Sequence, residues 1–129
     1  MADTYTYDHT HYKCSEPEKT AQWFKDHFGA KEVRRRTVRN LPIISLNAGG
    51  QIVNFSTPLP TEQVEERPAK PRYGVYHICF AVRHIEARAA ELKAKGVKFT
   101  MEPTQVTDEL KISFLEGPDG ISVELLENL

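Results

Sequence analysis

The feature that most constrains the fold is an internal repeat with a spacing of 68 residues. Similar residues recur at this spacing in the two halves of the chain: His9 and His77, Tyr12 and Phe80, Glu18 and Glu86, Ala21 and Ala89, Phe24 and Leu92. The spacing falls to 67 between Gly29 and Gly96. Each half is therefore expected to fold as one supersecondary unit, repeated in tandem.

Alternating apolar residues, helical stripes and turn residues predict the order strand, helix, strand, strand, strand in each half. The expected strands are 5–14, 31–39, 42–47 and 51–56 in the first half, and 75–82, 97–102, 110–115 and 121–126 in the second. The fold class is thus α+β, with two βαβββ modules forming a curved mixed sheet. The modules are assigned to 1–57 and 74–129, and the proline-rich stretch 58–73 is a surface linker.

The helix of each half has recognisable ends. Ser15 and Glu18 have the spacing of a capping box, and the helix is expected to run to about Phe28, where Gly29 ends it. The second helix is expected over about 85–95, with Gly96 after it.

Composition excludes several classes of function. The formal net charge of −1 predicts no attraction to nucleic acid or anionic membrane, and no apolar run is long enough to span a bilayer. The first residues lack the pattern of a signal peptide, and the two cysteines, Cys14 and Cys79, form no disulfide framework. We expect a cytoplasmic protein with free thiols.

Strand alternation places polar side chains on one face of each predicted sheet. In 75–82, the alternation puts Tyr76, Ile78, Phe80 and Val82 on a core face, and Val75, His77, Cys79 and Ala81 on the other. The same reasoning directs four side chains at one concave space: His9, Asn54, His77 and Glu124.

Two imidazoles and one carboxylate on strands can hold a divalent metal and leave coordination positions open for a substrate. His9, His77 and Glu124 form this set, and Glu124 has a second use as a base. Asn54 would add a weak carbonyl ligand or hydrogen-bond a metal-bound water. The alternative is a satisfied polar cluster that binds no metal.

Other residues are candidates for contact with a substrate or for proton transfer. His11 lies two residues from His9 on the same face, which suits substrate binding or proton transfer. Cys79 is expected to be a small lining residue. Arg34 and Arg36 share one strand face and could bind an anion, although a solvated edge would explain them as well.

The sequence resembles the vicinal oxygen chelate superfamily, which includes glyoxalase I, extradiol dioxygenases and bleomycin-resistance proteins. The resemblance covers nearly the whole chain and depends on the segments Asp8-His9, Ser15-Glu16-Pro17-Glu18-Lys19, Phe28-Gly29, 74–82, Lys95-Gly96-Val97 and 117–125. It implies a central metal cavity, one divalent metal per site (Fe, Mn, Zn, Ni or Co), a small-molecule substrate and a homodimer.

Carried over from the resemblance, the metal ligands fall on His9, His77 and Glu124. The fourth ligand of a glyoxalase, usually glutamate, falls on Asn54, and this departure weakens the case for glyoxalase I chemistry itself. The resemblance therefore implies a lyase or isomerase of the glyoxalase type, with an Fe(II) extradiol-type dioxygenase and a metal-free antibiotic-binding protein as alternatives. The loop 107–111 does not resemble that of the fosfomycin enzymes.

Overall fold

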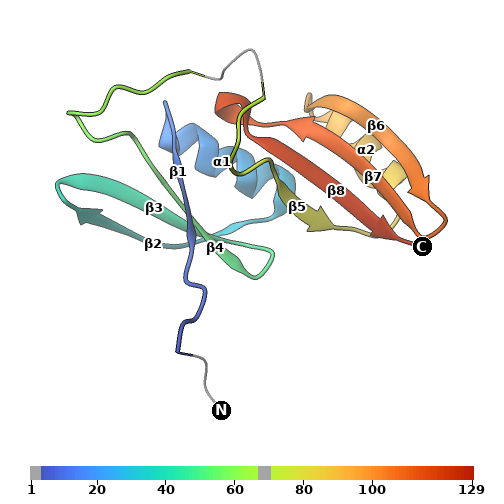
Figure 1. Ribbon diagram of the computed structural model, residues 1–129, viewed down its shortest axis with the longest axis horizontal. Coiled ribbons are helices and arrows are strands. Elements are labelled where there is room, and N and C mark those ends of the chain that lie inside the picture. The colour runs from blue at the N-terminus through green and yellow to red at the C-terminus, as the bar shows by residue number, and fades with distance from the viewer. Residues whose placement is uncertain (1–3, 67–70) are drawn as a thin grey trace. The chain divides into compact units, whose positions relative to one another are not determined.

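The computed structural model describes residues 4–66 and 71–129, and the chain divides into two compact units, Met1–Val64 and Glu65–Leu129. The described part of each unit contains one α-helix and one four-stranded mixed sheet (Figure 1), so the predicted α+β fold of two tandem βαβββ modules is confirmed. Part of the predicted linker, 67–70, lies outside the described residues.

The first module has the strand order β1-β4-β3-β2. Its elements are β1 (Thr10–Lys13), α1 (Pro17–Phe28), β2 (Lys31–Val38), β3 (Leu41–Ala48) and β4 (Gln51–Ser56). β1 pairs with β4 in parallel, and the other neighbours are antiparallel. α1 covers one face of the sheet, where the Phe24 ring stacks on Phe55 with 5.4 Å between centroids. Both side chains are fully buried, so this contact forms the centre of the first core.

The second module repeats this plan with the order β5-β8-β7-β6. Its elements are β5 (Ile78–Ala81), α2 (Ile85–Ala94), β6 (Lys98–Thr107), β7 (Leu110–Glu116), the short 3₁₀ helix η1 (Pro118–Gly120) and β8 (Ser122–Asn128). β5 pairs with β8 in parallel. β1 and β5 are related by the 68-residue spacing at both ends, so the repeat predicted from the sequence extends to strand boundaries.

The structure corrects two kinds of detail, and the first is where elements begin and end: β1 begins at Thr10 rather than at residue 5, and β6 ends at Thr107 rather than at residue 102. α1 begins at Pro17, with Glu16 rather than Ser15 as its N-cap, and no side chain caps it. A proline suits this first position because its φ is fixed and its missing N–H would have no partner there. The C-terminal end is as expected, because Gly29 adopts the left-handed conformation with φ of 63°.

The second correction concerns the stretch that precedes β5. The strand begins at Ile78, so His77 lies just before it and Tyr76 does not join the core face. Tyr76 is 72% exposed and stacks on Phe114 of β7, with 5.6 Å between ring centroids. Phe114 pairs across the sheet with Glu124, so Tyr76 lies on the polar face instead. Period-2 alternation fails here because the chain is no longer a strand.

α2 begins without a cap from its own sequence. His84, its N-cap residue, has a left-handed backbone conformation, with φ of 57°. The backbone N–H groups of His84 and Ile85 donate to the carboxylate of Glu127, which lies on β8. These two hydrogen bonds hold the pKa of Glu127 below its usual value. The start of α2 is thus fixed by a side chain from a distant part of the module.

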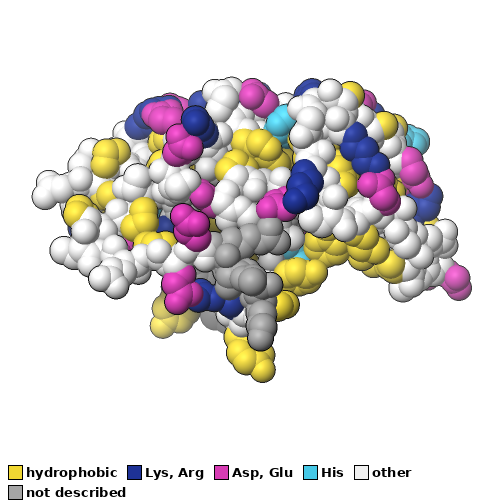
Figure 2. Space-filling view, turned by 90° about the horizontal axis from the view of Figure 1, so that it is seen from above, with side chains coloured by type: hydrophobic (Ala, Val, Ile, Leu, Met, Phe, Trp, Pro, Cys, Tyr) yellow, Lys and Arg dark blue, Asp and Glu magenta, His cyan; other side chains and the backbone are white. Residues whose placement is uncertain are grey.

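Acidic and basic side chains are interspersed on the face shown in Figure 2. The described residues form several surface ion pairs, such as Lys111 with Glu86 at 2.6 Å and Arg88 with Glu91 at 2.8 Å. Over the described residues, no helix is long and apolar enough to cross a membrane.

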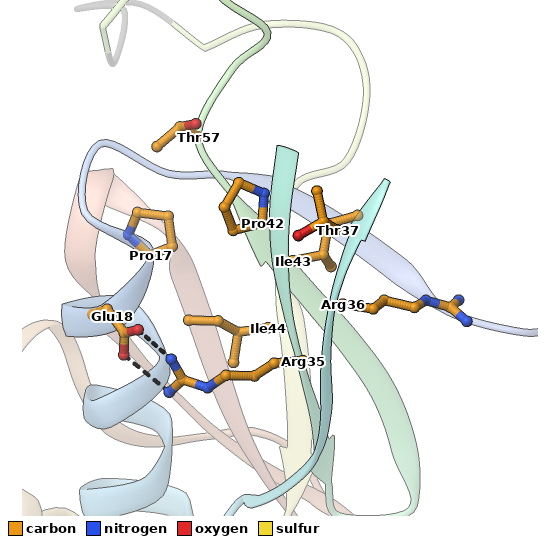
Figure 3. A pocket seen from close by; sticks show the side chains of 9 residues that line it. All are labelled: Pro17, Glu18, Arg35, Arg36, Thr37, Pro42, Ile43, Ile44 and Thr57. Carbon is orange, nitrogen blue, oxygen red and sulfur yellow. Dashed lines mark hydrogen bonds and ion pairs between the residues drawn. The ribbon is translucent and has the colours of Figure 1, made fainter. Parts of the chain in front are cut away.

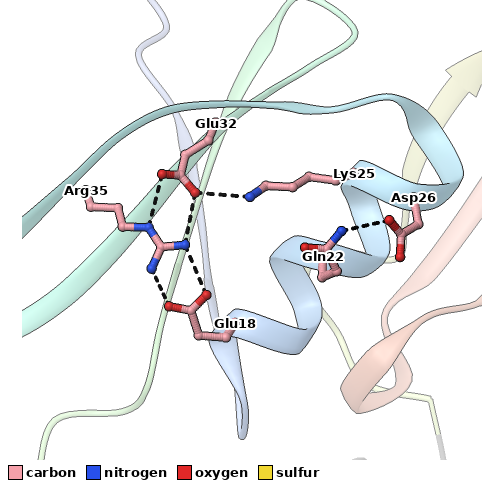
Figure 4. Close-up of polar contacts among 6 residues, drawn as sticks. All are labelled: Glu18, Gln22, Lys25, Asp26, Glu32 and Arg35. Carbon is pink, nitrogen blue, oxygen red and sulfur yellow. Dashed lines mark hydrogen bonds and ion pairs between the residues drawn. The ribbon is translucent and has the colours of Figure 1, made fainter.

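One ion-pair cluster joins α1 to β2 and gives a pH-dependent prediction. The guanidinium of Arg35 donates to both Glu18 and Glu32, and Lys25 adds a second cation to Glu32 at 3.1 Å (Figure 4). These hydrogen bonds lower the pKa of Glu32 from 4.5 to about 2 and also lower that of Glu18. A carboxylate with a lowered pKa stabilises the fold above its unfolded pKa and loses this effect as the pH falls.

We therefore expect Arg35→Gln to reduce stability at pH 7, and the difference from wild type to disappear between pH 4.5 and about 2. Urea unfolding of both proteins across this pH range measures the effect. Because the cluster is exposed, the difference should be modest and should shrink in high salt. A difference that persists at pH 2 would show that Arg35 acts through packing and not through its charge.

Candidate functional site

The second module brings two of the predicted metal ligands together. His77 immediately precedes β5, and Glu124 lies on the adjacent strand β8, with His77 Nε2 3.1 Å from Glu124 Oε1. Their side chains are 24% and 12% exposed. The other ring nitrogen of His77, Nδ1, is buried and has no hydrogen-bond partner among the described residues. A buried nitrogen without a partner costs free energy, so contacts with the protein satisfy only one of the two ring nitrogens of His77.

Aromatic rings hold the His77 imidazole in place. The centroids of Tyr76 and Phe114 lie 4.5 and 5.1 Å from that of His77, both in edge-on contacts. These rings restrict the orientation of the imidazole next to the carboxylate. Neither aromatic residue was expected at the site: Tyr76 was placed in the core by alternation, and nothing in the sequence marks Phe114.

Cys79 lies on the same sheet face as Glu124, because the two residues are register partners on β5 and β8. Burial, together with a hydrogen bond to Glu124 and the charge of that carboxylate, raises the pKa of the Cys79 thiol to about 12. A thiol with so high a pKa is protonated at neutral pH and is a poor nucleophile. Cys79 is therefore a lining residue that donates to Glu124.

In the first module, His9 occupies the position equivalent to His77, immediately before β1. Its Nδ1 lies 2.7 Å from Oδ2 of Asp8, and its side chain is 35% exposed. A carboxylate on one ring nitrogen fixes the tautomer and leaves Nε2 to bind a ligand, which is a common arrangement for metal-binding histidines. Sequence reasoning assigned no role to Asp8, although its position next to His9 was the available signal.

Asn54 occupies the position in the first module that Glu124 has in the second. Asn54 is opposite His11 in the β1–β4 register, as Glu124 is opposite Cys79 in the β5–β8 register. Asn54 is only 4% exposed, and the hydroxyl of Ser45 donates to its Oδ1 at 2.6 Å. This distance is typical of O–H···O bonds. The remaining end of Asn54 is therefore an NH2 group, which donates hydrogen bonds and cannot ligate a metal.

His11 also lies on this face and is held by a short chain of hydrogen bonds. Its Nε2 is 2.6 Å from the Ser56 hydroxyl, which itself donates to the backbone carbonyl of Thr57 at 3.0 Å. Because Ser56 has one proton to give, His11 Nε2–H is the donor and Nδ1 carries the lone pair. Burial, and then the charges of His9 and Lys13, lower the pKa of His11, so the imidazole is neutral near pH 7.

The three consecutive arginines of β2 divide between the two sheet faces. Arg34 pairs with Ser45, and Arg36 with Ile43, whereas Arg35 pairs with Ile44. Ser45 lies beside Asn54, so Arg34 shares the face of Asn54 and His11. The charges of Arg34 and Arg36 also contribute to lowering the pKa of Asp8, after the hydrogen bond and charge of His9. The alternation of the arginines was predicted, but only the register shows which of them face the site.

The described part of the first module also has a pocket of about 290 Å³, which His9, His11, Arg34 and Asn54 do not line. It lies between the start of α1 and strands β2 and β3, as Figure 3 shows, and it is lined by Pro17, Glu18, Arg35, Arg36, Thr37, Pro42, Ile43, Ile44 and Thr57. Of the predicted site residues, Arg36 alone is in this set. Two of its charged lining residues, Glu18 and Arg35, are already paired with each other.

Within residues 4–66 and 71–129, no three His, Cys, Asp or Glu side chains form a group that could hold a metal. The predicted ligands belong to both compact units, each of which is described by itself: His9 to the first, and the His77–Glu124 pair to the second. Their assignment to one metal ion therefore stays a prediction.

The chain is similar in sequence to two curated proteins. It is 26% identical to Glyoxalase I of Saccharomyces cerevisiae, covering 92% of this chain and 44% of the relative. It is 33% identical to the uncharacterized protein YaeR of Escherichia coli, covering 65% of this chain and 63% of that protein. The chain thus spans less than two thirds of both curated relatives.

Solved structures show the same architecture. A glyoxalase family protein from Enterococcus faecalis superposes with a TM-score of 0.76 at 27% identity, covering 96% of this chain and 98% of that one. A mutant form of the fosfomycin resistance protein FosX of Listeria monocytogenes has a TM-score of 0.74 at 18% identity, covering 96% of this chain and 92% of that one. That structure contains Mn(II) and 1S,2S-dihydroxypropylphosphonic acid.

A family description matches almost the whole sequence. The match covers residues 6–125 and therefore includes both histidine-bearing segments and Glu124. The chain belongs to the Glyoxalase/Bleomycin resistance protein/Dioxygenase superfamily.

Proposed function

We propose that the protein is a metal-dependent enzyme of the glyoxalase type, with lyase or isomerase chemistry on a small oxygenated substrate. His9, His77 and Glu124 would hold one divalent cation. The observation that carries the proposal is the His77–Glu124 pair, 3.1 Å apart, whose imidazole has a buried nitrogen without a partner among the described residues. Two imidazoles and a carboxylate suit a divalent transition metal such as Fe, Mn, Zn, Ni or Co.

The first module supports the proposal through the Asp8–His9 hydrogen bond. This contact orients His9 and leaves its Nε2 available. When bound, a divalent cation would act as a Lewis acid on two substrate oxygens. The side chains of the chain itself would then supply orientation and proton transfer.

Two residues are suited to move the proton. The neutral imidazole of His11 has its lone pair on Nδ1 and can accept a proton near neutral pH. Glu124 receives a hydrogen bond from Cys79, which steadies the carboxylate. Asn54 would donate an N–H hydrogen bond to a substrate oxygen, because its carbonyl is occupied by Ser45.

The second candidate function is an Fe(II) extradiol-type dioxygenase. It is favoured by Asn54, since an amide that presents N–H donors leaves only the two histidines and one carboxylate as ligands. The third candidate is a metal-free binding protein. The predictions of a homodimer and of a cytoplasmic location also stay predictions.

The experiment uses protein purified without chelator, analysed first for metal. The enzyme proposal expects one ion per chain, with metal-dependent exchange of the C–H protons of hydroxyacetone with deuterated solvent, followed by NMR. Bound iron with O₂ uptake in the presence of catechol would replace it with the dioxygenase. Protein that holds no metal after incubation with each of the five cations would favour the metal-free binding protein.

A further inference from the structure

We propose that the polar face of the first module binds an oxyanion, a carboxylate or phosphoryl group of the substrate, through Arg34, Arg36 and Asn54. The inference deepens the proposed function, on which it rests, by naming the class of substrate: a small oxygenated molecule that carries a negative charge.

The three arginines of β2 lie on two different faces of the sheet. The middle one, Arg35, turns to the helix side and donates to two carboxylates, those of Glu18 and Glu32. Figure 3 shows the Arg36 side chain directed away from the Arg35–Glu18 pair. The register of β2 with β3 places Arg34 on the same side as Arg36, beside Ser45. β2 thus carries the neutralised guanidinium of Arg35 on its helix side and those of Arg34 and Arg36 on the opposite face.

Arg34 and Arg36, unlike Arg35, have no neutralising partner in the described part of the chain. Among the residues that the structure describes, the side chains of Arg34 and Arg36 take part in no hydrogen bond or ion pair. Their charges contribute to lowering the pKa of the Asp8 carboxylate, after the hydrogen bond and charge of His9. That carboxylate is itself hydrogen-bonded to His9. Two positive charges therefore remain available on this face.

The amide of Asn54 supplies a hydrogen-bond donor on the same face. It lies in the same row of the sheet as Arg34, with Ser45 between them. Asn54 is only 4% exposed, and its Oδ1 accepts from Ser45, so its NH2 group is a fixed donor. No described residue accepts from this NH2 group. An amide donor that is fixed in place and has no protein acceptor is available to a ligand that supplies oxygen.

The spacing of Arg34 and Arg36 allows both side chains to contact one anion. Alternate residues of a strand are about 6.6 Å apart, so two long guanidinium side chains can converge on one group with two or more oxygens. Arginine suits this role because its planar fork matches carboxylate and phosphate geometry. The combination of two cations and one neutral donor selects an anion over a neutral polar group.

The test uses the full-length protein after removal of metal with EDTA, titrated by calorimetry with inorganic phosphate and with acetate. The stronger binder of the two identifies the class of oxyanion. The double variant Arg34→Gln/Arg36→Gln is expected to bind it at least about tenfold more weakly, as the loss of hydrogen bonds to a charged group implies. Arg35→Gln removes one positive charge from the other face of β2 and is expected to leave the affinity unchanged.

Equal weakening in the double variant and in Arg35→Gln would overturn the proposal, because it would show general attraction to positive charge. Absence of binding to wild type, or full binding by the double variant, would also overturn it. Circular dichroism checks that the variants are folded. Metal content before EDTA treatment separates this idea from the proposed function. A double variant that purifies with its metal but no longer binds the anion supports the oxyanion site. A wild type that purifies without metal, in the absence of chelator, and still binds the anion refutes only the metal enzyme.

Discussion

Replacing His77 by alanine is expected to abolish metal binding, with an affinity loss of more than about 100-fold. Loss of a residue that only supports a metal ligand reduces metal affinity by up to about 100-fold. His77 is proposed to bind the metal directly, so its loss should cost more. The variant leaves Glu124, which lies 3.1 Å from the imidazole, as a largely buried carboxylate without its histidine partner. Competition titration with a metal-sensitive dye measures the change.

Glu124→Gln should behave like His77→Ala, because it keeps the shape of the side chain and removes the charge that neutralises the cation. The matched control is His84→Asn, which removes an exposed imidazole from the same module and keeps a residue that tolerates the left-handed conformation found there. Undiminished metal affinity in both His77→Ala and Glu124→Gln would mean that the metal binds elsewhere.

The largest expected effect on stability is that of Phe24→Ala, about 3–5 kcal/mol. Phe24 is fully buried and stacks on Phe55, and its ring also contacts Trp23 and Phe28 at centroid distances of 5.0 and 6.0 Å. Truncation would remove this packing and leave a cavity between α1 and the sheet. Urea unfolding followed by circular dichroism gives the free energy of unfolding.

The control for Phe24→Ala is Gln22→Ala, on the exposed side of the same helix, where a change of no more than about 0.5 kcal/mol is expected. The repeat offers a second check, because Leu92 holds the equivalent position on α2 and is 6% exposed. Leu92→Ala is expected to cost about 2–5 kcal/mol. A loss below about 1 kcal/mol for Phe24→Ala would show that the stack is not the centre of the core.

The repeat explains why so much of the fold could be predicted. The apolar stripe of α1 and the alternation in β4 both require a partner face, and the structure joins them at Phe24 and Phe55. The prediction was wrong just before β5, where an alternating sequence pattern continues beyond the end of the strand. Tyr76 fits a strand pattern, but the chain outside β5 is not paired, and its ring moves to the opposite side to stack on Phe114.

The site was only partly predictable for a related reason. Candidate ligands could be found because an imidazole recurs at equivalent places in the two modules and a carboxylate, Glu124, lies on the same face as the second one. The structure brings His77 to Glu124. The side chains that orient them depend on contacts across strands. The role of Ser45 in turning the Asn54 amide, and the facing of Arg34, become visible only from the register of β2, β3 and β4.

The most direct test of the metal enzyme is the metal content of the His9→Ala variant, compared with wild type and with His11→Ala. His9 is the one proposed ligand from the first module, and His11, two residues further, is assigned to proton transfer. We predict one ion per chain in wild type and in His11→Ala, and none in His9→Ala. A His9→Ala protein that keeps its full complement of metal would contradict the three-ligand site.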